Sequence, residues 1–322
     1  MRFTALFASF LAGLVLASPA AAQSFPERPI KVIVPYGPGG VDGQIRLAGP
    51  FMAQILGQPL VVENRAGAGA AIGTAAVRNS EPDGYTLLFT GTSALSVLPQ
   101  MRANLGYKME DFVPIGNVTG TALVLVARST APFKTFAELV AYAKANPGKV
   151  NMGSSGVGTT THMIGEALQD AAGIKFTHIP YTGMAQVVQA MLAGTADLMI
   201  GIPGAFIGQI RGGGLRALAT TGNQRSEFFP DVTTVKEAGY NVVEETKFGV
   251  LAPKGTPPAV VDKLSGALRA AVTSKEFVDT MKKNFVTPVY MDQKGMAEAL
   301  RQEEEFWGAL LKRPDFRNAV QG

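Results

Sequence analysis

Residues 30–40, Ile-Lys-Val-Ile-Val-Pro-Tyr-Gly-Pro-Gly-Gly, place a short β-rich apolar run directly before a loop of glycine and proline. A helical stretch follows, and the same order of run, loop and helix returns at residues 150–172 and in several other places. Short apolar runs bounded by turn residues are typical of strands buried on both faces, and their alternation with helices favours parallel α/β sheets. The pattern therefore predicts an α/β fold of open, mostly parallel sheets flanked by helices.

The number of strands argues for two lobes. About eleven strand-like runs exceed what one compact sheet usually holds, and no low-complexity linker divides the chain. Residues 121–128 and 243–251 are β-rich and roughly symmetric about the middle, so we expect the chain to cross between lobes there. The predicted division gives lobe 1 residues 23–124 and 247–322, and lobe 2 residues 125–246.

The N-terminal segment has the features of an export signal. Arg2 precedes an apolar stretch at residues 3–17, and Ala20-Ala21-Ala22 provides a small-residue cleavage site. The apolar stretch is too short for a stable membrane span. We expect residues 1–22 to be a cleaved signal peptide, which leaves 322 − 22 = 300 residues in a periplasmic mature protein.

Composition excludes several kinds of function. The chain has 29 Lys and Arg against 25 Asp and Glu, a net charge of +4 without a basic run, so we expect no nucleic-acid partner. It has no cysteine and two histidines, which excludes thiolate nucleophiles and multi-histidine metal sites. Residues 153–157 do not complete the Gly-x-Ser-x-Gly nucleophile pattern. We expect no enzyme, metal or cofactor, although the residues alone leave a hydrolase or lyase open.

The glycine loops favour binding of a small anion. Loops at the carboxyl ends of parallel strands lead into helix N-termini, where free N–H groups and the helix dipole favour negative charge. Serine and threonine hydroxyls add donors, and no loop carries the phosphate-binding Lys pattern. Asp42 is equally compatible with a helix-start carboxylate and with a ligand contact. The glycines at residues 67–73 are better explained by close helix packing than by dinucleotide binding, and His162 and His178 by structural roles.

Many motifs in order resemble one family. They include Pro38-Gly39-Gly40, the segment Gly57-Gln58-Pro59-Leu60-Val61-Val62-Glu63-Asn64-Arg65 with Gly67-Ala68-Gly69, Pro82-Asp83-Gly84-Tyr85, Ser154-Ser155-Gly156, and Gly214-Leu215-Arg216-Ala217. The mature chain resembles the Bug-type extracytoplasmic solute receptors of the tripartite tricarboxylate transporter, or TctC-like, family. The resemblance implies a two-lobed periplasmic binding protein of the Venus-flytrap type. It also implies a monomer that captures a small organic acid and docks on a two-subunit membrane permease.

The resemblance also implies where the ligand binds. Backbone N–H groups and hydroxyls of the loop after the first strand would hold the carboxylate together with a facing loop of lobe 2. The expected ligand-binding residues are Tyr36, Gly39, Gly40, Asp42, Thr92, Ser93, Ser154, Ser155, Gly158, Thr159, Thr160, Tyr181, Gly201 and Lys247.

Three departures from the family pattern bear on the ligand. Only Val41 separates Gly40 from Asp42, where the family usually has two residues, which puts the role of Asp42 in doubt. After Leu198-Met199 many relatives carry polar residues, whereas this chain has Ile200-Gly201-Ile202. The lower polarity expected near the pocket favours an aromatic or short aliphatic acid over citrate. Lys247 stands where many relatives place Trp, and it fits either a second carboxylate contact or a solvated strand lysine.

The expected function is that of a receptor supplying an organic acid to a secondary transporter. The alternative is a ligand sensor that presents its closed form to a membrane histidine kinase. Deletion of the receptor would separate the two, because the first predicts loss of uptake and the second loss of gene induction.

Overall fold

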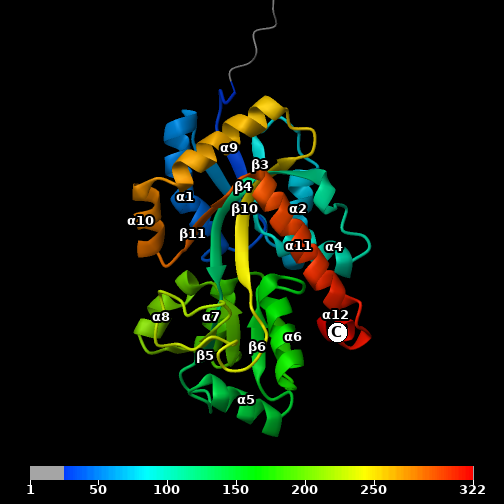
Figure 1. Ribbon diagram of the computed structural model, residues 1–322, viewed down its shortest axis with the longest axis vertical. Helices are drawn as coiled ribbons and strands as arrows, with labels where there is room; N and C mark the ends of the chain where they lie inside the picture. The colour runs from blue at the N-terminus through cyan, green and yellow to red at the C-terminus, as the bar shows by residue number, and fades with distance from the viewer. Residues whose placement is uncertain (1–24, 322) are drawn as a thin grey trace, which may run out of the picture.

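The computed structural model describes residues 25–321 and shows two α/β lobes, one above the other in Figure 1. The predicted signal peptide, residues 1–22, lies outside the described residues. Two long strands, β4 (Phe112–Ala122) and β10 (Glu245–Pro253), run along the middle of the molecule between the lobes. Within residues 25–321, no helix combines the length and apolar character that a membrane crossing requires.

The first sheet has six strands in the order β11-β4-β10-β3-β1-β2. Besides β4 and β10, these are β1 (Ile30–Val34), β2 (Leu60–Asn64), β3 (Thr86–Gly91) and β11 (Pro288–Met291). β1 pairs in parallel with β2 and β3, whereas β10 and β4 are antiparallel to each other and β10 is antiparallel to β3. The run that opens the pattern, β1, lies between β3 and the edge strand β2, and all its residues except Lys31 are buried, as its apolar sequence predicts.

The second sheet has five strands in the order β7-β6-β8-β5-β9. They are β5 (Val124–Arg128), β6 (Asn151–Ser154), β7 (Thr177–Pro180), β8 (Leu198–Gly201) and β9 (Leu215–Thr220). β6 is parallel to β7 and β8, and β5 is antiparallel to β8 and β9. Both sheets are therefore mixed: β10 is antiparallel to both of its neighbours in the first sheet, and β5 is antiparallel to both of its neighbours in the second.

Helices flank both sheets (Figure 1). Around the first sheet lie α1 (Val41–Leu56), α2 (Ala71–Arg78), α3 (Ser93–Ser96), α4 (Leu98–Met101), α9 (Pro258–Val272), α10 (Lys275–Lys283) and α11 (Gln293–Leu311). Around the second lie α5 (Phe136–Ala145), α6 (Thr160–Ala172), α7 (Met184–Leu192) and α8 (Ile207–Arg211). α5 begins where Thr135 Oγ1 accepts a hydrogen bond from Glu138 N at 3.2 Å, which a Thr-x-x-Glu sequence predicts.

The crossings bear on the proposed lobe limits. The chain passes from β4 to β5 through Leu123, and it re-enters the first sheet at Glu245. We keep 124/125 and 246/247 as the proposed limits of the lobes. The proposed division places the C-terminal helix α12 (Pro314–Gln321) in lobe 1, but this helix packs against α6 of lobe 2. Arg313 strengthens this contact through an ion pair with Asp170 at 2.8 Å.

Candidate functional site: a cavity between the lobes

A small cavity lies where the β1–α1 loop of the first lobe meets the β6–α6 loop of the second. Its volume is about 20 Å³, room for about one water molecule. The residues that line it are Tyr36, Gly37, Gly40, Val41, Ser155, Thr159, Thr160, Thr161, Gly183, Met184 and Phe248. Both loops follow strand carboxyl ends, so this is the position that the α/β pattern predicts for a ligand.

The β1–α1 loop uses its own donors internally. The Asp42 carboxylate accepts hydrogen bonds from Gly39 N at 2.9 Å and Gly40 N at 3.1 Å. Its other oxygen accepts from Arg46 Nε at 3.0 Å, one turn along α1. Of the two roles considered for Asp42, this structure therefore shows the helix-start carboxylate, and the two amides expected to hold a ligand carboxylate are engaged by Asp42.

Tyr36 supplies an aromatic wall. The residue is 6% exposed, and its hydroxyl lies 3.2 Å from Thr90 Oγ1 in a hydrogen bond. Burial raises the pKa of Tyr36 above its ordinary value, so the phenol stays neutral. A neutral, fixed ring offers an apolar face and no charge to a ligand.

The β6–α6 loop presents hydroxyls at the start of a helix. Gly156 and Gly158 have φ angles of 127° and 80°, which glycine adopts readily and which curl the loop over the N-terminus of α6. Thr161 Oγ1 accepts from Ser155 N at 3.0 Å, and Thr159 Oγ1 donates to Gly156 O at 2.7 Å. Within the described residues, the buried Ser155 hydroxyl has no hydrogen-bond partner.

Two stacked histidines form hydrogen bonds with this loop. His162 Nδ1 accepts a hydrogen bond from Gly158 N at 3.1 Å, and His178 Nε2 lies 2.6 Å from Ser154 Oγ. The rings stack with centroids 4.0 Å apart. Burial lowers the pKa of His162 to about 3, helped by neighbouring His178, and lowers that of His178 to about 4. Both rings are thus neutral near pH 7 and hold the loop, in agreement with the structural roles expected for them.

The lobes touch directly beside the cavity. Gly37 N donates to Thr182 O at 3.1 Å, and Thr160 Oγ1 donates to Ser93 Oγ at 2.9 Å. Gly69, with φ 65°, approaches Val157 so closely that a Cβ there would collide with the Val157 carbonyl oxygen. The glycines of the 67–73 segment therefore serve close packing, and Gly69 does so across the two lobes.

The structure brings some of the expected residues together. Tyr36, Gly40, Ser155, Thr159 and Thr160 line the cavity. Among the others, Gly39, Asp42, Ser93, Ser154 and Gly158 make the loop and interlobe hydrogen bonds described above. Thr92, Tyr181 and Gly201 do not line the cavity either. Thr92 N donates to Lys247 O at 3.1 Å, Tyr181 N donates to Ser154 O at 2.9 Å, and Gly201 packs on Phe206.

Lys247 lies apart from the cavity. Its Nζ donates to Glu245 O at 3.3 Å, and its side chain lines a separate hollow of about 170 Å³ with Glu244 and Glu303. Burial raises the pKa of both carboxyls. In this structure Lys247 therefore faces protein carboxyl groups, which differs from the expected contact with a second ligand carboxylate.

Two further lining residues, Gly37 and Val41, belong to the loop after the first strand that was expected to hold the ligand, and sequence reasoning missed the other four: Thr161, Gly183, Met184 and Phe248. Gly183 lies three residues after the end of β7 and carried the same strand–glycine signal as the other loops. Phe248 belongs to β10 and reaches the cavity only because that strand crosses between the lobes, which local sequence does not show. Among the described residues, no group of three or more His, Asp or Glu side chains is placed to hold a metal.

Two lobes, two crossing strands and a donor-rich cavity between them define the periplasmic binding protein fold. Solved structures share it. BugD superposes with a TM-score of 0.85 at 33% identity, over 89% of this chain and 98% of that chain. An R. palustris protein solved with adipate gives 0.86 at 26% identity, over 89% and 97%. MatC from Rhodopseudomonas palustris with bound malate gives 0.82 at 25%, over 92% and 100%.

The family is shown by sequence as well. The model of the tripartite tricarboxylate transporter family receptor, TctC, matches residues 45–315. The protein BugT of Bordetella pertussis is 36% identical over 315 residues, covering 97% of each chain. The chain therefore belongs to the TctC family of solute-binding receptors, as its motifs predict.

Proposed function

We propose that this receptor captures a small organic acid in the cavity between the lobes and delivers it to a two-subunit membrane permease. The observation that carries the proposal is the buried, unpartnered hydroxyl of Ser155, which lies in the loop leading into α6 and lines the same cavity as Tyr36. The first turn of a helix leaves N–H groups without intrahelical partners, and its dipole favours an anion. Adipate and malate in two structures of similar proteins are consistent with a carboxylate ligand.

Binding requires movement of the lobes. A cavity of about 20 Å³ admits no organic acid, so the lobes separate to receive one and close around it. A ligand that contacts both loops interacts more strongly with the closed arrangement and shifts the population toward it. The closed form is then the state that a permease would recognise.

The lining suggests the shape of the acid. Tyr36, Val41, Met184 and Phe248 are apolar, whereas the hydroxyls come from the 155–161 segment. One carboxylate would therefore rest on the α6 side and an apolar body against the first lobe. This division favours an aromatic or short aliphatic acid over citrate.

A ligand panel tests the proposal. The mature chain, residues 23–322, is unfolded and refolded to remove carried-over ligand, and its melting temperature is measured with mono-, di- and tricarboxylates, aromatic acids, amino acids and uncharged controls. A ligand at 100 times its Kd adds about 2.7 kcal/mol to the free energy of unfolding. We expect stabilisation by one class of acid. Stabilisation by uncharged compounds alone would contradict the proposal.

Two further measurements concern the partner and the chemistry. Deletion of the receptor gene should abolish uptake of the acid, and loss of gene induction with uptake intact would instead indicate a sensor. The acid recovered from the complex should be chemically unchanged, and turnover would indicate an enzyme.

A further inference from the structure

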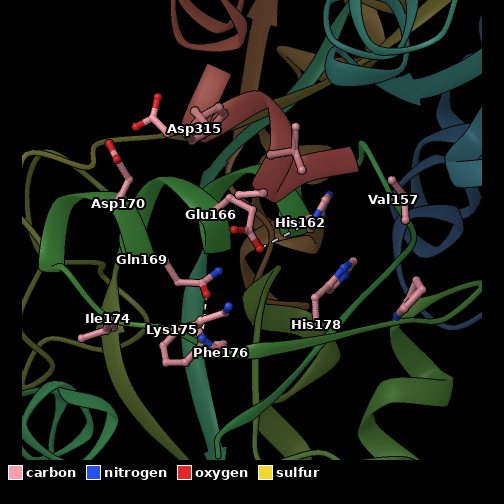
Figure 2. Close-up of a pocket in the computed structure, with 14 residues that line it drawn as sticks. Val157, His162, Glu166, Gln169, Asp170, Ile174, Lys175, Phe176, His178 and Asp315 are labelled. Carbon is pink, nitrogen blue, oxygen red and sulfur yellow. Dashed lines mark hydrogen bonds and ion pairs between the residues drawn. The ribbon is translucent and has the colours of Figure 1, made fainter. Parts of the chain in front are cut away.

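A second, larger cavity lies on the other side of the β6–α6 loop. Its volume is about 500 Å³, within the range typical of small-molecule sites, and it shares no lining residue with the cavity between the lobes. Figure 2 shows it framed by α6, the strand that carries His178, and the C-terminal helix above. Phe316 and Val320 of α12 form one wall, and Ile174 and Phe176 another.

Glu166 is the buried carboxyl group of this cavity. Its side chain is 8% exposed, and one carboxyl oxygen lies 3.7 Å from His162 Nε2. In Figure 2 the carboxyl group points inward to His162, with His178 on the same side of the cavity. Since Gly158 N donates to His162 Nδ1, the proton of the neutral ring is on Nε2, on the side of Glu166. The group next to Glu166 is thus a neutral N–H donor. A buried carboxylate is balanced best by a cation, and His162 does not supply one.

The other charges around the cavity do not balance Glu166. Arg313 is engaged by Asp170, with two hydrogen bonds of 3.0 and 2.8 Å, and by Asp315 at 2.8 Å. Lys175 lines the cavity, but no ion pair joins it to Glu166 in the described part of the chain. The cavity therefore holds one buried carboxyl without a cationic partner in residues 25–321, apolar walls, and a rim that includes Asp170, Asp315 and Lys175.

We propose that this cavity binds a small organic cation, a primary ammonium group carried on an apolar body. The ammonium would pair with the Glu166 carboxylate, and the apolar body would lie against Phe176, Phe316 and Val320. The ion pair is buried and hydrogen-bonded, the setting in which charge-assisted hydrogen bonds are strongest.

Other ligand classes fit less well. The imidazole planes are only 14° from parallel at 4.0 Å, so the in-plane lone pairs of the two rings cannot converge on one metal ion. An anion would meet the three carboxyl groups of Glu166, Asp170 and Asp315 against a single lining lysine, Lys175.

The site should respond to pH in a defined direction. Burial raises the pKa of Glu166 from 4.5 to about 7, with Gln169 opposing the shift. The polar and charged groups that line the cavity with it are His162, Gln169 and Asp170 on α6, His178 and Lys175 in and near β7, and Asp315 on α12. An ammonium group pairs only with the ionised carboxyl, so affinity rises as pH increases through 7, until the amine loses its proton near pH ~10.

The histidines provide a direct readout. The chain has two, His162 and His178, and both line this cavity, so the imidazole NMR signals of the untagged mature protein report directly on a ligand bound there. The probe is benzylammonium chloride, with benzyl alcohol and benzoate as controls of matched shape. We expect benzylammonium to shift both ring signals and to bind about tenfold or more tightly than either control. Equal binding of benzyl alcohol, or preferred binding of benzoate, would overturn the proposal.

Two variants sharpen the test. Glu166→Gln keeps the size of the side chain and removes the charge, and it should weaken benzylammonium at least about tenfold and abolish the rise in affinity as pH increases through 7. Ser155→Ala lies in the cavity between the lobes and should leave benzylammonium binding unchanged. Binding of benzylammonium that survives in Glu166→Gln but is lost in Ser155→Ala would place the cation in the other cavity and refute this site.

Discussion

The two loops that face each other across the interlobe cavity look alike in sequence but differ in their free donors. Residues 36–42 and 154–161 are both glycine-rich, and both join a buried strand to a helix. In the first, Asp42 lies in the opening turn of α1 and accepts from Gly39 N and Gly40 N. In the second, α6 has no acidic residue in its opening turn, and the Ser155 hydroxyl has no partner within the described chain.

This difference in free donors favours the second loop, residues 154–161, as the one that would bind an anion. A carboxylate of the protein already complements the dipole of α1, so a ligand carboxylate there would meet like charge. The N-terminus of α6 carries no such group, so a ligand carboxylate would supply it. In the proposed complex the first loop would contribute shape, through Tyr36, and the second would contribute charge recognition.

The largest expected effect comes from Ser155. Ser155→Ala removes the hydroxyl that would donate to the ligand carboxylate, and a hydrogen bond to a charged group contributes ~1.5–3 kcal/mol. We expect the Kd of the acid to rise about 10- to 100-fold in calorimetric titration. Ser265→Ala is the matched control, because Ser265 is also a buried serine, but its hydroxyl donates to Ile115 O at 2.7 Å in the first lobe. Equal loss of affinity in both variants would contradict a specific role for Ser155, and with it the proposed difference between the two loops.

This comparison also shows what the sequence can and cannot predict. The strand–loop–helix pattern predicted both loops, the eleven strands and the position of the cavity, because hydrophobic periodicity and glycine placement are local signals. It did not predict that Asp42 occupies the amides of its own loop, since the fit of a carboxylate to two N–H groups depends on loop geometry. Nor did it predict Phe248 or the position of α12 on α6, which arise from contacts between distant segments.

A smaller effect is expected where the lobes touch. Gly69→Ala would place a Cβ against the carbonyl oxygen of Val157 when the lobes are closed. Because the open form avoids this collision, the closed form loses population, and we expect the ligand to bind about tenfold more weakly, a change of ~1.4 kcal/mol. Small-angle scattering should show a more extended receptor at subsaturating ligand.

Gly57→Ala provides the control for Gly69→Ala. Gly57 has φ 73°, close to the 65° of Gly69, but a Cβ there has no neighbour within 4 Å. Both variants should lose ~1 kcal/mol of stability from the left-handed backbone, and Gly57→Ala should leave ligand affinity unchanged. If the two variants bind the acid equally, the Gly69 contact does not contribute to closure.

The smallest effect on binding is expected at Asp42. Asp42→Asn retains an oxygen that can accept from Gly39 N and Gly40 N, but it removes a negative charge from the opening turn of α1. The ion pair with Arg46 is half exposed on the arginine side, so its loss costs little. We expect stability to fall by ~0.5–1 kcal/mol and the Kd of the acid to change less than about threefold. Chemical denaturation and calorimetry measure the two quantities separately. A loss of binding as large as that of Ser155→Ala would show that Asp42 acts on the ligand, and that the first loop recognises charge as well as shape.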